Sequence, residues 1–218
     1  MLSFVIPTLN TAASLGATLR SISGNHEVVV VDGDSEDGSG AIAAAEGARV
    51  VSAPRGRGSQ LAAGIDAAKG EWLLLLHSDT RLAPGWKRAV HDHMAGDRHR
   101  AGYARFVLDS ADPRARRLER LVAWRCRAFG LPYGDQGLLV HRDLLRDAGG
   151  MRPLPLMEDV DLVRRIGRHR LVALDMAAIT SADKWHRQGW HRRSLRNLVC
   201  LALYFAGVPP RLIARLYG

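Results

Sequence analysis

Residues 28–39 read Val-Val-Val-Val-Asp-Gly-Asp-Ser-Glu-Asp-Gly-Ser, a run of β-branched residues followed at once by acidic and small polar ones. The valines predict a strand that is buried on both faces of a sheet. The Asp and Gly residues behind them predict a turn at the carboxyl end of that strand. A carboxylate at such a place is costly to bury without a partner, so Asp32 is a candidate ligand-binding residue.

Short apolar runs alternate with helical patterns on both sides of this stretch. Strands are predicted at residues 2–7, 28–32, 49–53 and 72–76, and helices at residues 12–23, 39–46 and 59–69. Continuous apolar strands separated by helices indicate parallel strands with helices on both faces. The predicted fold class is therefore α/β, with a mostly parallel central sheet.

The pattern becomes less regular after residue 100. Strands are predicted at residues 103–108, 137–141 and, as a short one, 171–174, and helices at residues 113–129, 158–167, 191–205 and 209–217. No repeat, linker or shift in composition divides the chain. We therefore expect residues 1–218 to form a single domain.

Composition narrows the class of protein. With 218 residues, 47% hydrophobic and 24% charged, the chain is globular rather than disordered or fibrous. Its formal net charge is +9, and 28 of its 31 basic residues are arginines. Arginine suits phosphate and carboxylate partners, although a GC-rich genome produces the same bias. The charge alone therefore leaves the partner open.

Cysteine usage and hydropathy predict a cytoplasmic location. Cys126 and Cys200 stand far apart, without the spacing of a disulfide framework or a zinc site. The first residues lack the basic region of a signal peptide. The longest apolar run, residues 198–208, is shorter than the roughly twenty residues that a membrane-spanning helix needs.

Polar residues follow three of the predicted strands directly. They occupy residues 7–10 (Pro-Thr-Leu-Asn), 32–38 and 77–80 (His-Ser-Asp-Thr). In open α/β sheets, ligands bind outside the carboxyl ends of the strands. We favour ligand binding for Asp32 and Asp79, whereas for Asn10 and Asp37 capping of the following helices is an equal alternative.

Six motifs in a fixed order resemble family-2 glycosyltransferases of the GT-A fold. They are residues 4–10, 29–39, 55–71, 77–79, 134–137 and 157–162. His77-Ser78-Asp79 stands where that family has its Asp-x-Asp metal motif. The end of the chain, residues 180–217, further resembles a small bacterial subgroup associated with radical-SAM and selenodomain genes.

The resemblance implies a donor site in about residues 1–100. Its nucleotide-binding residues would be Pro7, Thr8, Asn10, Asp32, Asp34, Arg57, Gln60 and Ser78. Asp79, with His77 as a second candidate ligand, would hold Mg²⁺ or Mn²⁺ against the two phosphates of a UDP- or GDP-type sugar. Since imidazole is a poor ligand for Mg²⁺, two alternatives for His77 are bonding to the ribose and a structural role at the strand end.

The resemblance also implies an acceptor site in about residues 101–190, followed by C-terminal helices in residues 191–218. Asp159 would be the general base, and Glu158, Asp135 and Gln136 would orient the acceptor hydroxyl. One displacement with one base implies inversion at the anomeric carbon, and the resemblance implies a hexosyltransferase. The acceptor, for which a lipid-linked alcohol is one option, stays unidentified.

Several alternatives remain open. A nucleotidyltransferase has a related fold, but its usual glycine- and lysine-rich loop after the first strand is missing. A non-catalytic basic protein that binds nucleic acid or lipid would leave Asp32, Asp79 and Asp159 unexplained, so we expect no nucleic-acid partner. The basic amphipathic helix at residues 191–205 could contact a membrane peripherally or form a core or dimer face. One of Lys184, Trp185 and His186 is expected to close over the diphosphate.

Overall fold

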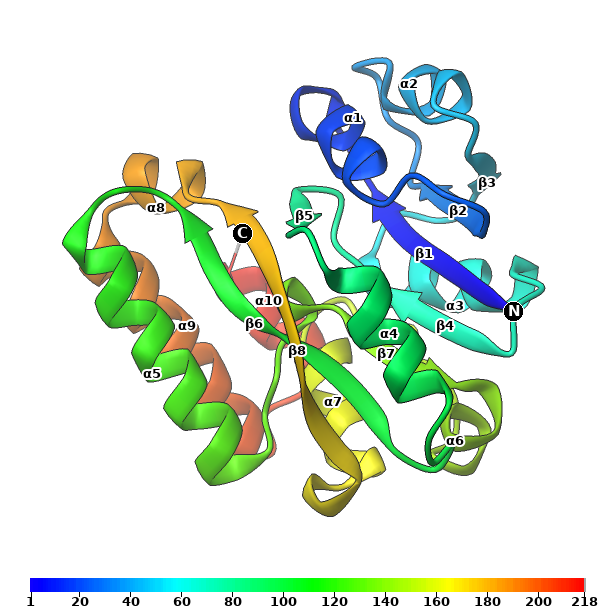
Figure 1. Cartoon of the computed structure of the whole chain (residues 1–218). Coiled ribbons are helices and arrows are strands. Elements are labelled where there is room, and N and C mark those ends of the chain that lie inside the picture. Colours follow the sequence, from blue (N-terminus) through cyan, green and yellow to red (C-terminus); the bar gives the residue numbers. More distant parts are fainter. Residues whose placement is uncertain (218) are drawn as a thin grey trace.

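One eight-stranded sheet organises the chain (Figure 1). In the computed structural model, which describes residues 1–217, the strand order is β3-β2-β1-β4-β7-β6-β8-β5. The parallel pairs are β1–β2, β1–β4, β2–β3 and β6–β8, and the antiparallel pairs are β4–β7, β6–β7 and β5–β8. The predicted α/β class with a mostly parallel sheet is confirmed.

The first half of the sheet alternates strand and helix as the apolar pattern predicts. Its elements are β1 (Leu2–Thr8), α1 (Ala12–Ser21), β2 (Glu27–Asp32), α2 (Ser39–Ala45), β3 (Arg49–Ser52), α3 (Arg57–Ala67) and β4 (Trp72–Leu75). Successive side chains of a strand point to opposite faces. Val29 and Val31 pack with α3 on one face, and Val30 packs with α1 and α2 on the other. The valine run is therefore buried from both sides.

The second half adds the antiparallel strands. Its elements are β5 (Thr80–Leu82), α4 (Trp86–Met94), β6 (Ala101–Asp109), α5 (Pro113–Phe129), the 3₁₀ turn η1 (Gly134–Gln136), β7 (Leu138–His141), α6 (Arg142–Asp147), α7 (Glu158–Ile166), η2 (Arg168–Arg170) and β8 (Leu171–Ser181). β7 pairs between β4 and β6, so it joins the two halves into one sheet.

Three helices close the chain: α8 (Asp183–Gln188), α9 (Trp190–Phe205) and α10 (Pro210–Tyr217). Figure 1 shows α9 running beside α5 at the edge of the molecule, away from β1–β3. A separate apolar cluster that includes Phe106, Val122, Trp185 and Trp190 lies between α5, α8, α9 and the sheet. Within residues 1–217, none of the helices combines the length and the apolar character that crossing a bilayer requires.

The prediction of a short strand at residues 171–174 is wrong, because β8 continues to Ser181. Tyr103 pairs with Ala173 and Arg105 with Ala177, so β8 carries extra residues at a bulge. Asp175 lies in that bulge with an exposed side chain. An acidic residue in an apolar run suggests a strand end, whereas the bulge turns it to solvent and lets the strand go on.

A glycine lets α3 approach the sheet closely. A Cβ atom on Gly64 would overlap Val5 and would lie 2.6 Å from Cγ2 of Val31. No side chain fits between the helix and the two strands there. Gly64 therefore sets how near the start of α3, with Arg57 and Gln60, comes to the strand ends.

We expect Gly64→Ala to lower the free energy of unfolding by about 1–3 kcal/mol, as is typical of overpacking. For a chain of this size this lowers Tm by several degrees, which thermal unfolding measures. Gly16→Ala in α1 is the control, since its Cβ would meet only the end of the Arg20 side chain, at 3.1 Å. Equal Tm values for the two variants would contradict the packing argument.

Candidate active site

A first cavity, of about 240 Å³, lies beside the ends of β1 and β4. We call it the donor-side cavity. Of the predicted nucleotide-binding residues, those that line it are Pro7, Thr8, Arg57, Gln60 and Ser78. The Oγ1 atom of Thr8 is buried and has no hydrogen-bond partner within residues 1–217. A buried hydroxyl without a partner is unfavourable, so a polar ligand at this wall would satisfy it.

Gln60 lines this cavity, and its amide nitrogen is hydrogen-bonded to the main chain. Its Nε2 donates to the carbonyl oxygens of Thr8, at 2.7 Å, and Val31, at 2.8 Å. The side chain thereby joins the ends of β1 and β2. Gln60 thus shapes the cavity wall.

The other predicted donor residues lie in the loops beyond the cavity lining. Asn10 has a left-handed backbone (φ 51°), and its Oδ1 accepts the Glu36 N–H at 2.9 Å. Asp32 accepts the Ser35 hydroxyl at 2.5 Å. Asp34 is also left-handed (φ 70°) and turns outward to solvent. The structure does not bring these three side chains together with Thr8 and Arg57.

Asp37 caps helices, one of the two roles considered for it. Its carboxylate accepts the N–H groups of Ala12, at 2.8 Å, and Ser39, at 3.0 Å. These residues begin α1 and α2, so one carboxylate satisfies both helix starts. The two loops at the strand ends are thereby tied together.

His77 and Asp79 follow β4 and stand between two cavities. The second cavity, of about 480 Å³, also contains Asp135 and Asp159, and we call it the acceptor-side cavity. His77, Asp79, Arg57 and Lys184 line both. Lys184, at the start of α8, places its Nζ 2.9 Å from Oδ2 of Asp79. Lys184 therefore lies beside the residue expected to hold the metal, and closure over a diphosphate stays a prediction.

One side of the His77 ring lies against the backbone of η1. A Cβ atom on Gly134 would lie 2.5 Å from Nε2 of His77, so the backbone of η1 rests directly on the ring. Burial, reinforced by the positive charge of Arg57, lowers the pKa of His77 to about 3. The imidazole is therefore neutral at pH 7, the form in which it can bind a metal.

The side chains of Asp79 and His77 fit a cation that takes most of its ligands from elsewhere. Within residues 1–217, no group of three or more His, Cys, Asp and Glu side chains is placed to hold a metal by itself. Mg²⁺ is usually bound by one or two carboxylates together with substrate phosphates and water. An imidazole ligand suits Mn²⁺ better than Mg²⁺. Asp79 and His77 match a cation of this kind.

Arg57 joins α3 to the start of α7. Its Nε donates to Oε1 of Glu158 at 2.5 Å, and its Nη2 lies 3.4 Å from Oδ2 of Asp159. Asp159 also accepts the Gly134 N–H at 2.7 Å. The Glu158 side chain is only 1% exposed, whereas Asp159 lines the acceptor-side cavity. Of the two acidic neighbours, Asp159 is therefore the more accessible.

Asp135 and Gln136 are adjacent but face different surroundings. Asp135 lines the acceptor-side cavity, and its Oδ1 is buried without a partner in the described chain. Burial is the main reason why the pKa of Asp135 rises to about 6. Gln136 turns into the protein instead, where its Nε2 donates to the Ala104 carbonyl at 2.9 Å. The structure therefore separates this predicted pair of acceptor residues.

The sequence analysis missed the contribution of α9 to the site. Arg193, Arg196 and Asn197 line the acceptor-side cavity. Both arginines donate to Oε1 of Gln188, at 2.7 and 2.5 Å. The basic pattern of this helix was visible, but it does not reveal which arginines turn inward. The packing of α9 against α8 decides this.

Comparison with known proteins places this site in a family. The sequence model for "Glycosyl transferase family 2" matches residues 3–150, more than half of the chain. This chain belongs to that family. The matched range includes His77 and Asp79 but ends before Glu158 and Asp159.

Curated relatives and solved structures are similar to parts of this chain or to its fold. An uncharacterized glycosyltransferase of Mycobacterium tuberculosis is 38% identical over 82 residues, which are 37% of this chain and 38% of that protein. A PGL/p-HBAD biosynthesis glycosyltransferase of the same species is 39% identical over 93 residues, 38% of this chain and 36% of that protein. The matched region thus spans less than two fifths of either relative.

Glucosyl-3-phosphoglycerate synthase from M. tuberculosis, crystallised with Mg²⁺ and UDP, superposes with a TM-score of 0.63 at 21% identity, over 96% of this chain and 80% of that one. Mannosyl-3-phosphoglycerate synthase from Rubrobacter xylanophilus gives a TM-score of 0.60 at 20% identity, over 95% and 75%. At these identities the likeness shows a shared fold.

The raised pKa of Asp135 makes stability depend on pH. The native state holds this proton more tightly than the unfolded chain, so the free energy of unfolding falls as pH rises from about 4 through about 6. Asp135→Asn removes the free-energy cost of ionising this buried carboxyl group. We expect the variant to exceed the wild type by about 1–3 kcal/mol at pH 7.5, with little difference at pH 4.

Urea unfolding of the chelator-treated protein at both pH values measures this difference. Asp92→Asn, at an exposed position of α4, is the control and should show no such change with pH. An Asp135→Asn variant that is less stable than the wild type at pH 7.5 would contradict the assignment.

Proposed function

We propose that this chain is a metal-dependent, inverting hexosyltransferase that uses a nucleoside diphosphate sugar and an acceptor hydroxyl. The observation that carries the proposal is that the donor-side and acceptor-side cavities share Arg57, His77, Asp79 and Lys184. A sugar diphosphate in one cavity would therefore present its anomeric carbon to a hydroxyl in the other. On this proposal, residues 1–100 form the donor half and residues 101–190 most of the acceptor half.

The donor would bind along Pro7, Thr8 and Ser78, with its diphosphate at Asp79 and His77. The proposed nucleotide site also includes the loops after β1 and β2, which contain Asn10, Asp32 and Asp34. The cation held by Asp79 and His77 would neutralise charge on the leaving diphosphate. Lys184 would add a second positive charge there. UDP in the crystal structure of a fold neighbour supports a uridine donor over a guanosine one.

Asp159 is the proposed general base. It would take the proton of the acceptor hydroxyl while that oxygen attacks the anomeric carbon and the nucleoside diphosphate leaves. Gly134 and Arg57 hold its carboxylate in place. Glu158 would position Arg57, and Asp135 would orient the acceptor. Gln136 would act indirectly, by fixing η1.

Location and subgroup remain part of the proposal. We place the enzyme in the cytoplasm, in the small bacterial subgroup associated with radical-SAM and selenodomain genes. Exposed Leu195 and Val199 on α9 lie among basic residues of the same helix. This arrangement supports peripheral contact with an anionic inner membrane face.

A thermal-shift panel of UDP and GDP, each with and without Mn²⁺ or Mg²⁺, tests the donor site. We expect UDP with metal to raise Tm by several degrees, because ligand at 100 times its Kd adds about 2.7 kcal/mol of stability. Asp79→Ala should abolish the effect of the metal, and Asp92→Ala should leave it unchanged. No shift with any nucleotide would contradict the proposed donor.

Asp159→Asn tests the base. We expect turnover of the sugar nucleotide to fall about 100-fold or more, with the UDP-induced shift in Tm retained. Asp161→Asn is the matched control in the same helix. Its carboxylate pairs with Arg165 at 2.7 Å and Arg152 at 3.1 Å. Its loss should therefore lower Tm, and it should reduce turnover much less than Asp159→Asn does. Unchanged turnover in Asp159→Asn would exclude Asp159 as the base.

A further inference from the structure

An apolar groove of about 550 Å³ lies between α5 and α9. Phe106, Val122 and Leu131 are among its deeper walls, and its rims include Leu121 and Trp124 of α5 and Leu198 of α9. Its volume falls within the range of about 300–1,000 Å³ that is common for small-molecule sites. We call it the α5–α9 groove.

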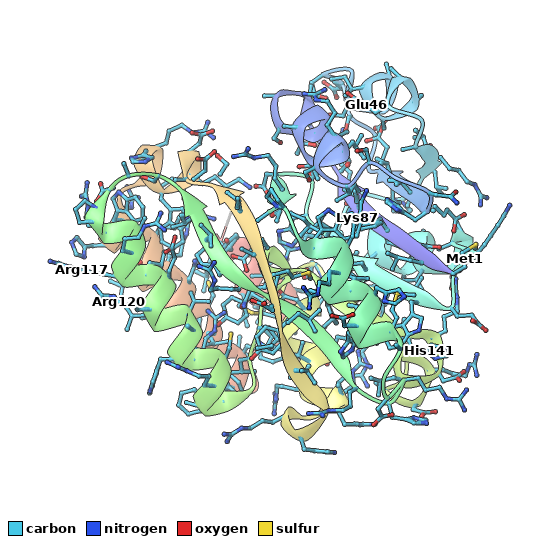
Figure 2. All side chains as sticks on the ribbon, viewed as in Figure 1. Met1, Glu46, Lys87, Arg117, Arg120 and His141 are labelled. Carbon is cyan, nitrogen blue, oxygen red and sulfur yellow. The ribbon has the colours of Figure 1, made fainter. Side chains whose placement is uncertain are left out.

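The rim side chains are far more exposed than a closed interface between two helices would leave them. Leu121 is 62% exposed, Trp124 55% and Leu198 63%. Figure 2 shows Arg117 and Arg120 of α5 pointing outward, so the basic side of this helix faces solvent while its apolar side faces the groove. A concave apolar surface of this kind marks a binding site.

The α5–α9 groove continues into the acceptor-side cavity. Tyr133, Asp135, Trp185 and Asn197 line both. At this junction the apolar walls give way to polar atoms, including the buried, partnerless Oδ1 of Asp135. A molecule with an apolar body and a hydroxyl at one end matches this change of surface.

We propose that the α5–α9 groove binds the alkyl or aryl part of the acceptor, so that the acceptor is an amphiphilic alcohol whose hydroxyl enters the cavity at Asp159. The inference rests on the proposed function. A bilayer surface would lie across the rims and leave the deep walls at Phe106 and Leu131 without contact, whereas a single chain or ring reaches them. The polar junction then orients the hydroxyl inward.

Calorimetric titration with 1-hexanol, 1-octanol and 1-decanol tests the groove. Each buried CH₂ group contributes about 0.8 kcal/mol, so full burial tightens Kd about fourfold per CH₂. We expect at least a tenfold gain from hexanol to decanol, together with a negative heat-capacity change. Leu198→Gln should weaken decanol binding at least fivefold.

Leu195→Gln is the matched control, because Leu195 is 64% exposed on the same helix but does not line the groove. It should leave decanol binding unchanged. A Kd independent of chain length, or equal losses in the two variants, would overturn the inference. The inference would also be overturned if Leu198→Gln left decanol affinity unchanged but abolished binding to phosphatidylcholine vesicles. The same holds if it left decanol affinity unchanged but abolished self-association.

UDP titration in the presence of Mn²⁺ separates this inference from the proposed function. Leu198→Gln should bind UDP as the wild type does, since the donor-side cavity lies away from the groove. If the affinity for the alcohols rises with chain length but UDP does not bind, the transferase proposal fails and the apolar site stands. If UDP binds but the alcohols do not discriminate by length, the amphiphilic acceptor is excluded and the transferase stands.

Discussion

The ion pairs of Arg57 with Glu158 and Asp159 hold the two halves of the site together. Arg57 begins α3, and the two carboxylates begin α7, about a hundred residues further along the chain. Glu158 is almost completely buried, so its charge depends on the guanidinium. The same arginine adds to the effect of burial in lowering the pKa of His77, and it reaches Asp159. One guanidinium therefore lines both cavities and contacts residues from both sides of the site.

Close backbone approaches keep that arrangement compact. Gly64 lets α3 lie directly on β1 and β2, which brings Arg57 to the strand ends. Gly134 lets η1 rest on His77 while its N–H binds Asp159. In both places a side chain is missing where one would push the groups apart. The geometry of the site thus depends on glycine at both positions, because a Cβ atom does not fit there.

The C-terminal helices contribute charged and apolar side chains to the acceptor-side cavity and the α5–α9 groove. Arg193 and Arg196 turn into the acceptor-side cavity, whereas Leu198 turns to the α5–α9 groove and Leu195 to solvent. One amphipathic helix therefore presents cationic, apolar and exposed surfaces in different directions. This surface lies outside the range matched by the family model, which ends at residue 150.

Apolar periodicity by itself determined the α/β class and the strands at residues 28–32 and 72–76, because burial on both faces needs continuous apolar runs. Motif order pointed to the family and to Asp79 and Asp159. Tertiary packing alone decided that Gln60 and Gln136 bond to main-chain carbonyls, that Asp34 faces solvent and that β8 passes Asp175 at a bulge. Only tertiary structure brought Lys184 to Asp79. Local sequence specifies which residues prefer burial, but the partner that a polar side chain finds depends on segments distant in the chain.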